Sequence, residues 1–286
     1  GAAGHQYRFA ALESVPPEKA AKATSFLLLG GILAAFVGPE LAVRGRALFG
    51  TEYAGSFLLL AGSYLAGLLI ISQYRDTVIL ENEHSSSGRP LFQILRSHVI
   101  ILAICAAALG YGIMSFIMTA TPISMHAHAG HSLDATKFVI QSHIAAMYLP
   151  SLVFAWLAAK IGFKGMLWTG VAVYVACLGI AALNTDFLNY WLALILLGIG
   201  WNFLFLSGTN LLPHGYRPEE RFRVQSANDF LVFSIQAIAS LSSGWFLFHW
   251  QWEGVLLACV PLLAGFCLVM WIVARSGTVL EVNRQS

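Results

Sequence analysis

The sequence predicts an all-α integral membrane protein, and two observations carry that prediction. Of the 286 residues, 58% are hydrophobic and only 10% are charged, and the mean hydropathy is +0.71. Soluble domains are closer to half apolar and a quarter charged, so this chain lacks the polar residues needed to cover a surface in water. The second observation is that its apolar residues gather in long runs. These features exclude a cytosolic enzyme, a secreted disulfide scaffold and a nucleic-acid-binding protein.

Eight of the apolar runs are long enough to cross a bilayer as helices. A spanning helix needs about 20 mostly apolar residues, because the hydrocarbon core is about 30 Å thick and each helical residue rises about 1.5 Å. None of the runs alternates apolar and polar residues as membrane β-strands do. We therefore expect eight transmembrane helices, at residues 24–43, 54–73, 97–118, 138–159, 166–183, 188–212, 230–250 and 254–274.

Prolines within or beside these runs predict where the helices end or bend. A proline lacks the backbone N–H group and clashes with the preceding turn, so it interrupts the helical hydrogen bonding. We expect such breaks at Pro122, Pro150 and Pro261.

The basic residues predict the orientation of the helices. When the connections are assigned alternately to the two sides of the membrane, thirteen of the sixteen Lys and Arg residues fall on one side. The other side carries only Arg44, Arg46 and Lys137. Cytoplasmic loops carry the excess of Lys and Arg, so the basic side is the cytoplasmic one. We expect a multi-pass membrane protein with both ends of this chain in the cytoplasm and no signal peptide at its start.

The hydrophilic segment 74–95 separates two helical groups. It contains a Ser-Ser-Ser-Gly run typical of flexible linkers. Two predicted spans precede it and six follow it, and an internal repeat accounts for this imbalance. Segments 15–25 and 216–226 both place Pro-Glu, basic residues and Ser before a long apolar run. Parallel six-helix repeats occur in transporters, so these segments predict that the first span is helix five, and the seventh span helix eleven, of a twelve-helix protein.

With these spans, linker and repeated segments, the sequence resembles the final two-thirds of a member of the major facilitator superfamily. Gly38-Pro39 in the first span is similar to the family's glycine-proline motif of helix five, although Glu40 follows where further glycines are expected. The segment Lys-Ile-Gly-Phe-Lys at 160–164 resembles the second copy of the family's cytoplasmic loop motif, with Ala159 in place of the usual aspartate. The sequence also resembles a bacterial branch of permeases, in segments 118–123, 198–205 and 225–230.

The resemblance implies a helical bundle of the major facilitator type in the bacterial inner membrane, with eight transmembrane helices present of an expected twelve. Residues 1–73 would then be the tail of helix four and helices five and six, which end the N-terminal half. Residues 74–95 would be the cytoplasmic linker, and residues 96–286 the C-terminal half with a short tail.

The function implied by the resemblance is secondary active transport of a small organic solute by alternating access, coupled to protons. The expected partners are this solute, protons and the lipid bilayer, with no nucleic acid. No catalytic residue and no cofactor are expected, because neither an HExxH nor a GxSxG motif is present. Two alternatives stay open, a metal-ion efflux permease and a non-transporting membrane sensor or scaffold.

Polar side chains within the apolar runs are the candidates for a substrate site, because polar groups are costly inside a membrane. Asn202 lies mid-span between two aromatic residues and offers donors and acceptors to a polar, partly flat solute. Its alternative role is an interhelical hydrogen bond. His143 either carries a coupling proton or lies at the outer membrane interface. Further candidates for the same cavity, each with helix packing as its alternative, are Gln141, Gln236 and Tyr111.

Charged residues near the span ends are candidates for gating or coupling. Asp229 either pairs with a nearby arginine such as Arg221 as a cytoplasmic gate, or caps the start of the seventh span. Glu40 either takes up a proton or forms an ion pair with Arg44, about one turn away. Arg8 resembles a buried arginine in helix four of the family.

Three histidines, His126, His128 and His131, form an HxHxxH pattern in an expected outer loop. Histidine is the commonest metal ligand, so the pattern is the one candidate metal site in the sequence. The loop has no Cys, and Asp134 is the nearest carboxylate. A solvated loop is the simpler interpretation, so we expect no metal site.

Overall fold

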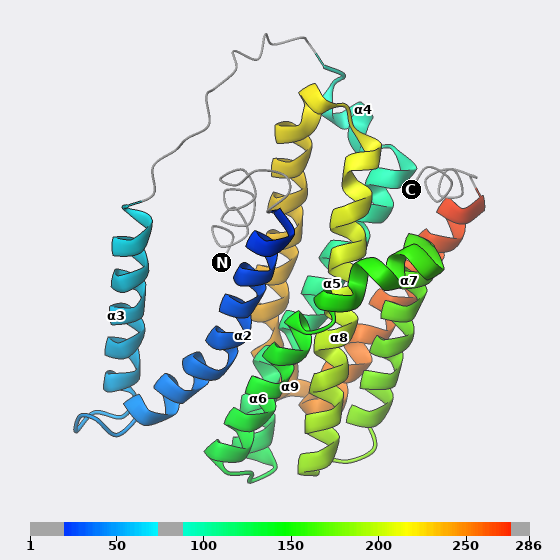
Figure 1. Cartoon of the computed structure of the whole chain (residues 1–286). Helices are drawn as coiled ribbons and strands as arrows, with labels where there is room; N and C mark the ends of the chain where they lie inside the picture. Colours follow the sequence, from blue (N-terminus) through cyan, green and yellow to red (C-terminus); the bar gives the residue numbers. More distant parts are fainter. Residues whose placement is uncertain (1–19, 74–87, 276–286) are drawn as a thin grey trace. The chain divides into compact units, whose positions relative to one another are not determined.

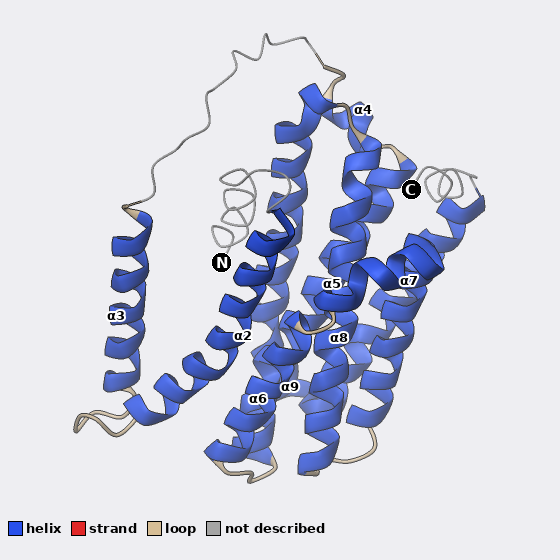
Figure 2. Cartoon of the chain, viewed as in Figure 1, coloured by secondary structure: helices blue, strands red, loops and turns tan. Residues whose placement is uncertain are grey.

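The computed structural model describes residues 20–73 and 88–275, and this part of the chain is helical with no strand (Figures 1 and 2). Within these residues the all-α prediction is confirmed. Arg8 and most of the predicted linker 74–95 lie outside the described residues. The α-helices are α2 (Ala20–Gly45), α3 (Ala54–Ile71), α4 (Leu91–Leu95), α5 (His98–Ile123), α6 (Leu133–Tyr148), α7 (Ser151–Ala181), α8 (Phe187–Leu211) and α9 (Arg221–Arg275).

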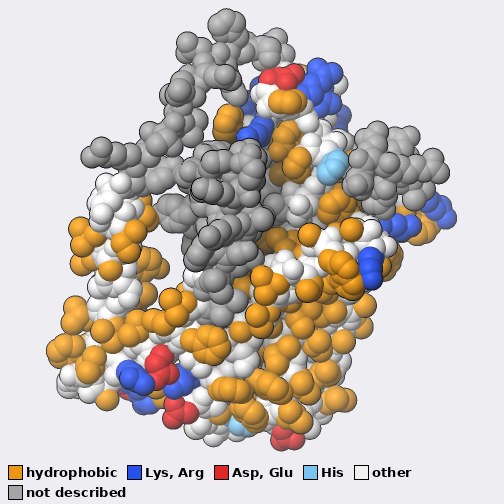
Figure 3. Space-filling view, in the orientation of Figure 1, with side chains coloured by type: hydrophobic (Ala, Val, Ile, Leu, Met, Phe, Trp, Pro, Cys, Tyr) orange, Lys and Arg blue, Asp and Glu red, His pale blue; other side chains and the backbone are white. Residues whose placement is uncertain are grey.

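Five helical stretches are long and apolar enough to cross a membrane: α3, and those that contain α5, α7, α8 and α9. α7 and α9 are each interrupted by one non-helical residue, Gly162 and Gln251. α9 thus comprises the seventh and eighth predicted spans, whereas α7 comprises the end of the fourth and most of the fifth. The outer surfaces of the five helical stretches are apolar, as lipid-facing helices require. Leu241, for example, is 84% exposed, and hydrophobic side chains cover much of the visible face in Figure 3.

The loop predicted between the fourth and fifth spans is reduced to Gly162. This residue has φ 68°, in the left-handed region that glycine adopts without a steric penalty. The helix axis of α7 changes direction there, as Figure 1 shows. Gln251 marks the corresponding turn in α9, between the seventh and eighth predicted spans.

The chain forms two compact units. Unit 1 comprises Gly1–Asn82 with Ser132–Ala145, and unit 2 comprises Glu83–His131 with Ala146–Ser286. The first boundary falls inside the predicted linker 74–95. Unit 1 therefore contains α2, α3 and most of α6, while unit 2 contains α4, α5, α7, α8 and α9.

In unit 1, α2 and α3 form a hairpin held by close backbone contact. A Cβ atom on Gly45 would lie 2.5 Å from the backbone of Ser56, and one on Gly55 would lie 2.3 Å from Gly45 O. Ser56 Oγ donates a hydrogen bond to Ala42 O at 2.6 Å. Two glycines thus let the helices approach closely, as small residues do between membrane helices.

In unit 2, α5 lies at the centre and packs against both α8 and α9, and α7 packs against α8. Small residues make these contacts close. A Cβ atom on Gly208 of α8 would lie only 2.5 Å from Ala103 O of α5. The hydroxyl of Tyr174, on α7, donates to Gly110 O of α5 at 2.8 Å. Unit 2 is therefore a bundle organised around α5.

The break predicted at Pro150 is confirmed, and it divides the span predicted at 138–159, because α6 ends at Tyr148 and α7 begins at Ser151. Two other details differ from the sequence predictions. The break predicted at Pro261 is wrong, since α9 continues through it without a non-helical residue there. Membrane helices tolerate proline where neighbouring groups satisfy the freed backbone. Part of the predicted linker is helical, as α4.

Candidate functional site

Four aromatic side chains from three helices of unit 2 form what we call the aromatic cluster. Trp201 and Phe205, one turn apart on α8, stack with centroids 5.1 Å apart and planes 9° apart. Tyr111 of α5 packs edge-on against both, at 5.2 and 5.0 Å. It also contacts Phe233 of α9 at 5.8 Å. Tyr111 and Trp201 are buried, whereas Phe205 and Phe233 are half-buried, so the cluster retains partly accessible aromatic faces.

Glycines on either side of Tyr111 set its position. A Cβ atom on Gly110 would lie 3.2 Å from Leu204 Cβ of α8, and one on Gly112 would lie 3.1 Å from Ile235 of α9. Each glycine thus lets α5 approach one neighbouring helix closely. Tyr111, between them in sequence, consequently reaches aromatic rings on both helices.

Asn202 is buried on α8 and joins two other helices. Its Nδ2 donates to Met147 O of α6 at 2.8 Å and to Ser151 Oγ of α7 at 2.5 Å. The interhelical hydrogen bond given as its alternative role is therefore present. Its Oδ1, and the preceding residue's Trp201 Nε1, are both buried without a hydrogen-bond partner among the described residues. Consecutive residues of α8 thus hold an unused acceptor and an unused donor.

Gln236 is half-buried on α9, three residues after Phe233 of the aromatic cluster. One turn further on, Ser240 Oγ and Thr119 Oγ1 of α5 form a hydrogen bond at 3.1 Å. The candidates Tyr111, Asn202 and Gln236 therefore lie on three helices that pack together in unit 2.

The candidates His143 and Gln141 lie on the part of α6 that belongs to unit 1. His143 is buried and lies in the third turn of α6, which begins at Leu133. Its position at the outer membrane interface and its role as a proton carrier both stay predictions. Gln141 Nε2 donates to Phe36 O of α2 at 3.0 Å, so its amide bridges two helices of unit 1. These two residues belong to a different unit from the aromatic cluster.

Glu40 of α2 is held by two cations. Its Oε1 lies 2.7 Å from Arg44 Nε, and its Oε2 lies 2.9 Å from Lys137 Nζ of α6. Lys137 also reaches Asp134 Oδ1 at 3.2 Å. The ion pair with Arg44 that the sequence offered as an alternative is present, and Lys137 adds a second. This geometry favours a structural role for Glu40 over proton transfer.

Asp229 does not cap a helix, so that part of the prediction is wrong. α9 begins at Arg221, which places Asp229 about two turns inside the helix, where its Oδ1 accepts a hydrogen bond from Asn228 Nδ2 at 3.1 Å. The helix starts earlier because the 3₁₀ turn η4 (Pro218–Glu220) precedes it, with proline at its first position and Glu at its third. The gating role of Asp229 and Arg221 stays a prediction.

An ion pair that the sequence analysis missed joins the chain before α4 to η4. Arg89 Nη2 and Nε contact Glu220 Oε2 and Oε1 at 2.7 and 2.9 Å. The backbone N–H groups of Arg89 and Arg217 also donate to this carboxylate, at 3.1 and 2.9 Å. The Glu220 side chain is fully buried. The Pro-Glu-Glu sequence could have placed Glu220 at a helix start, but nothing local marks a partner 131 residues away.

The pKa of Glu220 is held at about 2, against an ordinary value of 4.5. The main cause is the hydrogen-bonded Arg89 guanidinium, followed by the backbone N–H of Arg217. Glu220 precedes the predicted span 230–250, so it lies outside the membrane-spanning segments. The pKa of Arg89 is raised in return. The lowered pKa of Glu220 favours the charged form of this pair near neutral pH, which disfavours a role in proton transfer.

Two of the three loop histidines bond to the backbone, and the three side chains are not grouped to hold a metal ion. His126 Nδ1 lies 2.8 Å from His131 O, and His131 Nε2 lies 2.8 Å from Thr185 O. A carbonyl oxygen only accepts, so both ring nitrogens donate. His128 instead packs near the ring of Phe248, at 6.4 Å. Over residues 20–73 and 88–275, no group of three or more His, Cys, Asp or Glu side chains is placed to hold a metal ion.

Long apolar helices with buried polar groups define a multi-pass helical membrane protein. The chain belongs to the Major Facilitator Superfamily, whose sequence model matches residues 9–240. The resemblance noted from its motifs is thereby confirmed.

Three relatives share most of this chain. It is 36% identical over 261 residues to the riboflavin transporter RfnT of Brucella anthropi, covering 90% of this chain and 65% of the relative. It is 32% identical over 263 residues to the uncharacterised MFS-type transporter YddS of Bacillus subtilis, covering 85% and 60%. A second transporter of that kind from the same organism, YdeG, is 31% identical over 256 residues, covering 84% and 59%. The chain thus spans less than two thirds of the length of each relative.

Proposed function

We propose that the chain forms part of a secondary transporter for a small, planar organic solute with both hydrogen-bond donors and acceptors. The observation that carries this proposal is an unused buried donor on Trp201, a member of the aromatic cluster, together with an unused buried acceptor on the adjacent residue of α8, Asn202. A buried polar group without a partner costs about 1–3 kcal/mol. A solute that stacks on the aromatic faces and bonds to these atoms recovers that cost.

Riboflavin, or a molecule with a similar ring system, is the first candidate for this solute. One relative is named as a riboflavin transporter. The isoalloxazine ring of riboflavin is flat and carries an N–H group and carbonyl oxygens, which match an Asn acceptor and an indole N–H donor in kind. Stacked and edge-on aromatic contacts, such as those within the aromatic cluster, are also favourable for such a ring.

Transport would proceed by alternating access, with two helical groups moving about the solute and the movement coupled to protons. The Arg89–Glu220 pair is a poor proton carrier, because the pKa of Glu220 is about 2. His143 is the better candidate, since it is buried and histidine ordinarily changes charge between about pH 5 and 8. We further propose the inner membrane as the location, with the Lys- and Arg-rich ends of the helices in the cytoplasm.

Uptake of labelled riboflavin tests the proposed substrate. The protein is expressed in a bacterial strain that neither makes nor imports riboflavin, and the uptake of labelled riboflavin by these cells is measured. We expect uptake with the natural sequence and with Trp168→Leu, a matched change at an exposed tryptophan of α7. We expect little uptake with Trp201→Leu at equal protein level in the membrane. No uptake by the natural sequence would exclude riboflavin, and normal uptake by Trp201→Leu would exclude this site.

A further inference from the structure

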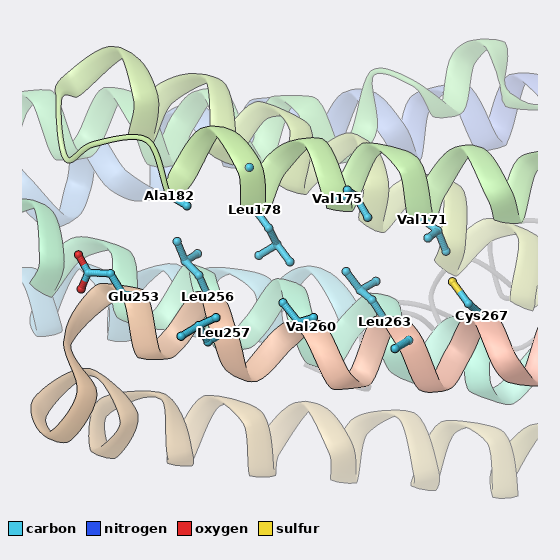
Figure 4. Close-up of a pocket in the computed structure, with 12 residues that line it drawn as sticks. Val171, Val175, Leu178, Ala182, Glu253, Leu256, Leu257, Val260, Leu263 and Cys267 are labelled. Atoms are coloured by element: carbon cyan, nitrogen blue, oxygen red, sulfur yellow. The ribbon is translucent and has the colours of Figure 1, made fainter.

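A large apolar groove runs between the second part of α7 and the last part of α9, within unit 2. Its volume is about 720 Å³. Side chains such as Val171, Val175 and Leu178 of α7 face Leu256, Val260 and Leu263 of α9 across it, as Figure 4 shows. The transport site proposed above does not use this groove, whose lining includes no member of the aromatic cluster.

One end of the groove is polar. Glu253 lies at that end, close to the turn in α9 (Figure 4). The same glutamate lines a second, smaller pocket of about 130 Å³, together with Ser124, His128, Tyr190 and Gln251. Because Glu253 lines both, the apolar groove and the polar pocket lie next to each other. The combined site suits a molecule with a polar head and an apolar tail.

The charge at this end favours a cationic head. Glu253 forms no ion pair within the described part of the chain, and Asp186 is a second exposed carboxylate at the same end of the helices. Every Lys and Arg described in unit 2 lies toward the opposite ends of its helices, for example Lys164 and Arg275. The side chains of His128 and Gln251 supply N–H groups beside the carboxylate.

We infer that the groove and the polar pocket together bind one phospholipid with a primary ammonium headgroup, such as phosphatidylethanolamine. The ammonium pairs with Glu253, the phosphate accepts from His128 and Gln251, and one acyl chain fills the groove. An acyl chain gains little by leaving a bilayer that is equally apolar. Selectivity therefore comes from the charge-assisted hydrogen bonds to the headgroup.

Thermal unfolding of the purified protein in detergent, with added lipids, tests this inference. Three lipids with identical dioleoyl chains are compared: phosphatidylethanolamine, phosphatidylglycerol and phosphatidylcholine. A ligand that binds only the folded protein raises its Tm. We expect phosphatidylethanolamine to raise Tm by about 3 °C more than the other two lipids. Native mass spectrometry on the same samples is expected to show one bound phosphatidylethanolamine.

Two pairs of variants separate the headgroup from the groove. Glu253→Gln is expected to lose the selective shift, and Glu219→Gln, the same change at an exposed glutamate that lines neither pocket, to keep it. Gly179→Leu fills the groove, because the position of a Cβ atom on Gly179 has no atom within 4 Å, and it is expected to lose the shift as well. Gly244 lies outside the groove, and a Cβ atom there also has no atom within 4 Å, so Gly244→Leu is expected to keep the selective shift.

Equal shifts with all three lipids, or a full selective shift in Glu253→Gln, would overturn the inference. So would a dimer in the mass spectra that Gly179→Leu dissociates, because the groove would then bind a second copy of the chain. The lipid readout is independent of transport, so it stands or fails separately from the proposed substrate.

Discussion

At the scale of single residues, Asn202 shows how one side chain serves both the fold and the proposed site. Its two amide hydrogens are used by Met147 O and Ser151 Oγ, which fixes the orientation of the amide. The oxygen is left as the one group that a solute can use. The two roles weighed from the sequence, interhelical bond and solute contact, therefore fall on different atoms of the same side chain.

Replacing Asn202 separates these roles. We expect Asn202→Ala to reduce transport at least about tenfold, since the loss of a buried hydrogen bond costs about 1.5 kcal/mol. Ser151→Ala removes one fixing contact but keeps the oxygen, so we expect it to reduce transport about twofold or less. Initial uptake rates at equal protein level measure both, with gel filtration to confirm folding. Equal losses in the two variants would show that Asn202 acts only through packing.

His143 carries the second prediction at this scale. If it carries the coupling proton, His143→Gln abolishes accumulation of solute against a gradient but leaves exchange of solute across the membrane, because exchange needs no net proton movement. His249→Gln, a change at an exposed histidine of α9, is the control and is expected to keep both activities. The comparison is made in proteoliposomes with and without a proton gradient. Uphill accumulation by His143→Gln would assign the coupling to another group.

At the scale of elements, close packing of α5 against α8 supports the aromatic cluster. We expect Gly208→Ala to destabilise the protein by about 1–3 kcal/mol, because its Cβ would meet the backbone oxygen of Ala103 at 2.5 Å. Gly244→Ala introduces the same methyl group where no atom lies within 4 Å, and we expect little change. Thermal unfolding in detergent measures both. Similar unfolding temperatures for the two variants would contradict this packing.

The Arg89–Glu220 pair yields a prediction about pH. The pKa of Glu220 is about 2 in the folded protein, below its ordinary 4.5, so the pair contributes fully above about pH 4.5 and its contribution is lost as the pH falls toward 2. We therefore expect Glu220→Gln to lower Tm by the same amount at pH 8, 7, 6 and 5. Glu219→Gln, at the exposed neighbouring residue, is the control and is expected to have little effect. We further expect this difference to shrink as the pH is lowered from 5 to 3, and a difference that stays constant over that range would show that the pKa is not lowered.

Much of the element structure could be predicted, because helix length in a membrane follows from bilayer thickness. The runs at 54–73, 97–118 and 188–212 correspond closely to α3, α5 and α8. Element ends were harder to predict. The span at 138–159 reads as one apolar run although Pro150 divides it, and the start of α9 was placed too late because residues 221–229 are polar. Hydropathy records burial in lipid, whereas a helix begins where its backbone hydrogen bonds begin.

Some residues of the candidate site could be predicted from the sequence, but the way in which their side chains come together could not. Asn202 and Tyr111 were found because polar groups are rare inside membrane helices. Trp201, Phe205 and Phe233 were not chosen as candidates, since aromatic residues in apolar runs are usually core. Their meeting depends on the glycines beside Tyr111, whose effect becomes visible only once the helices are packed.

At the scale of the whole molecule, we propose that the compact unit 2 moves as one body during transport. α5 packs against two long helices at its centre, and the Arg89–Glu220 pair ties the chain before α4 to the start of α9. Alternating access requires such rigid groups around a solute site. The central proposal is thus that unit 2 presents an aromatic, hydrogen-bonding surface to a planar solute.

Competition for riboflavin binding tests that claim most directly. The intrinsic fluorescence of riboflavin is followed as purified protein is added, and two unlabelled competitors are compared. Lumichrome has a flat ring system without the ribityl chain, and ribitol is the chain without the ring. We predict that riboflavin binds, that lumichrome displaces it, and that ribitol at the same concentration does not. Displacement by ribitol but not by lumichrome, or no binding of riboflavin, would contradict the account.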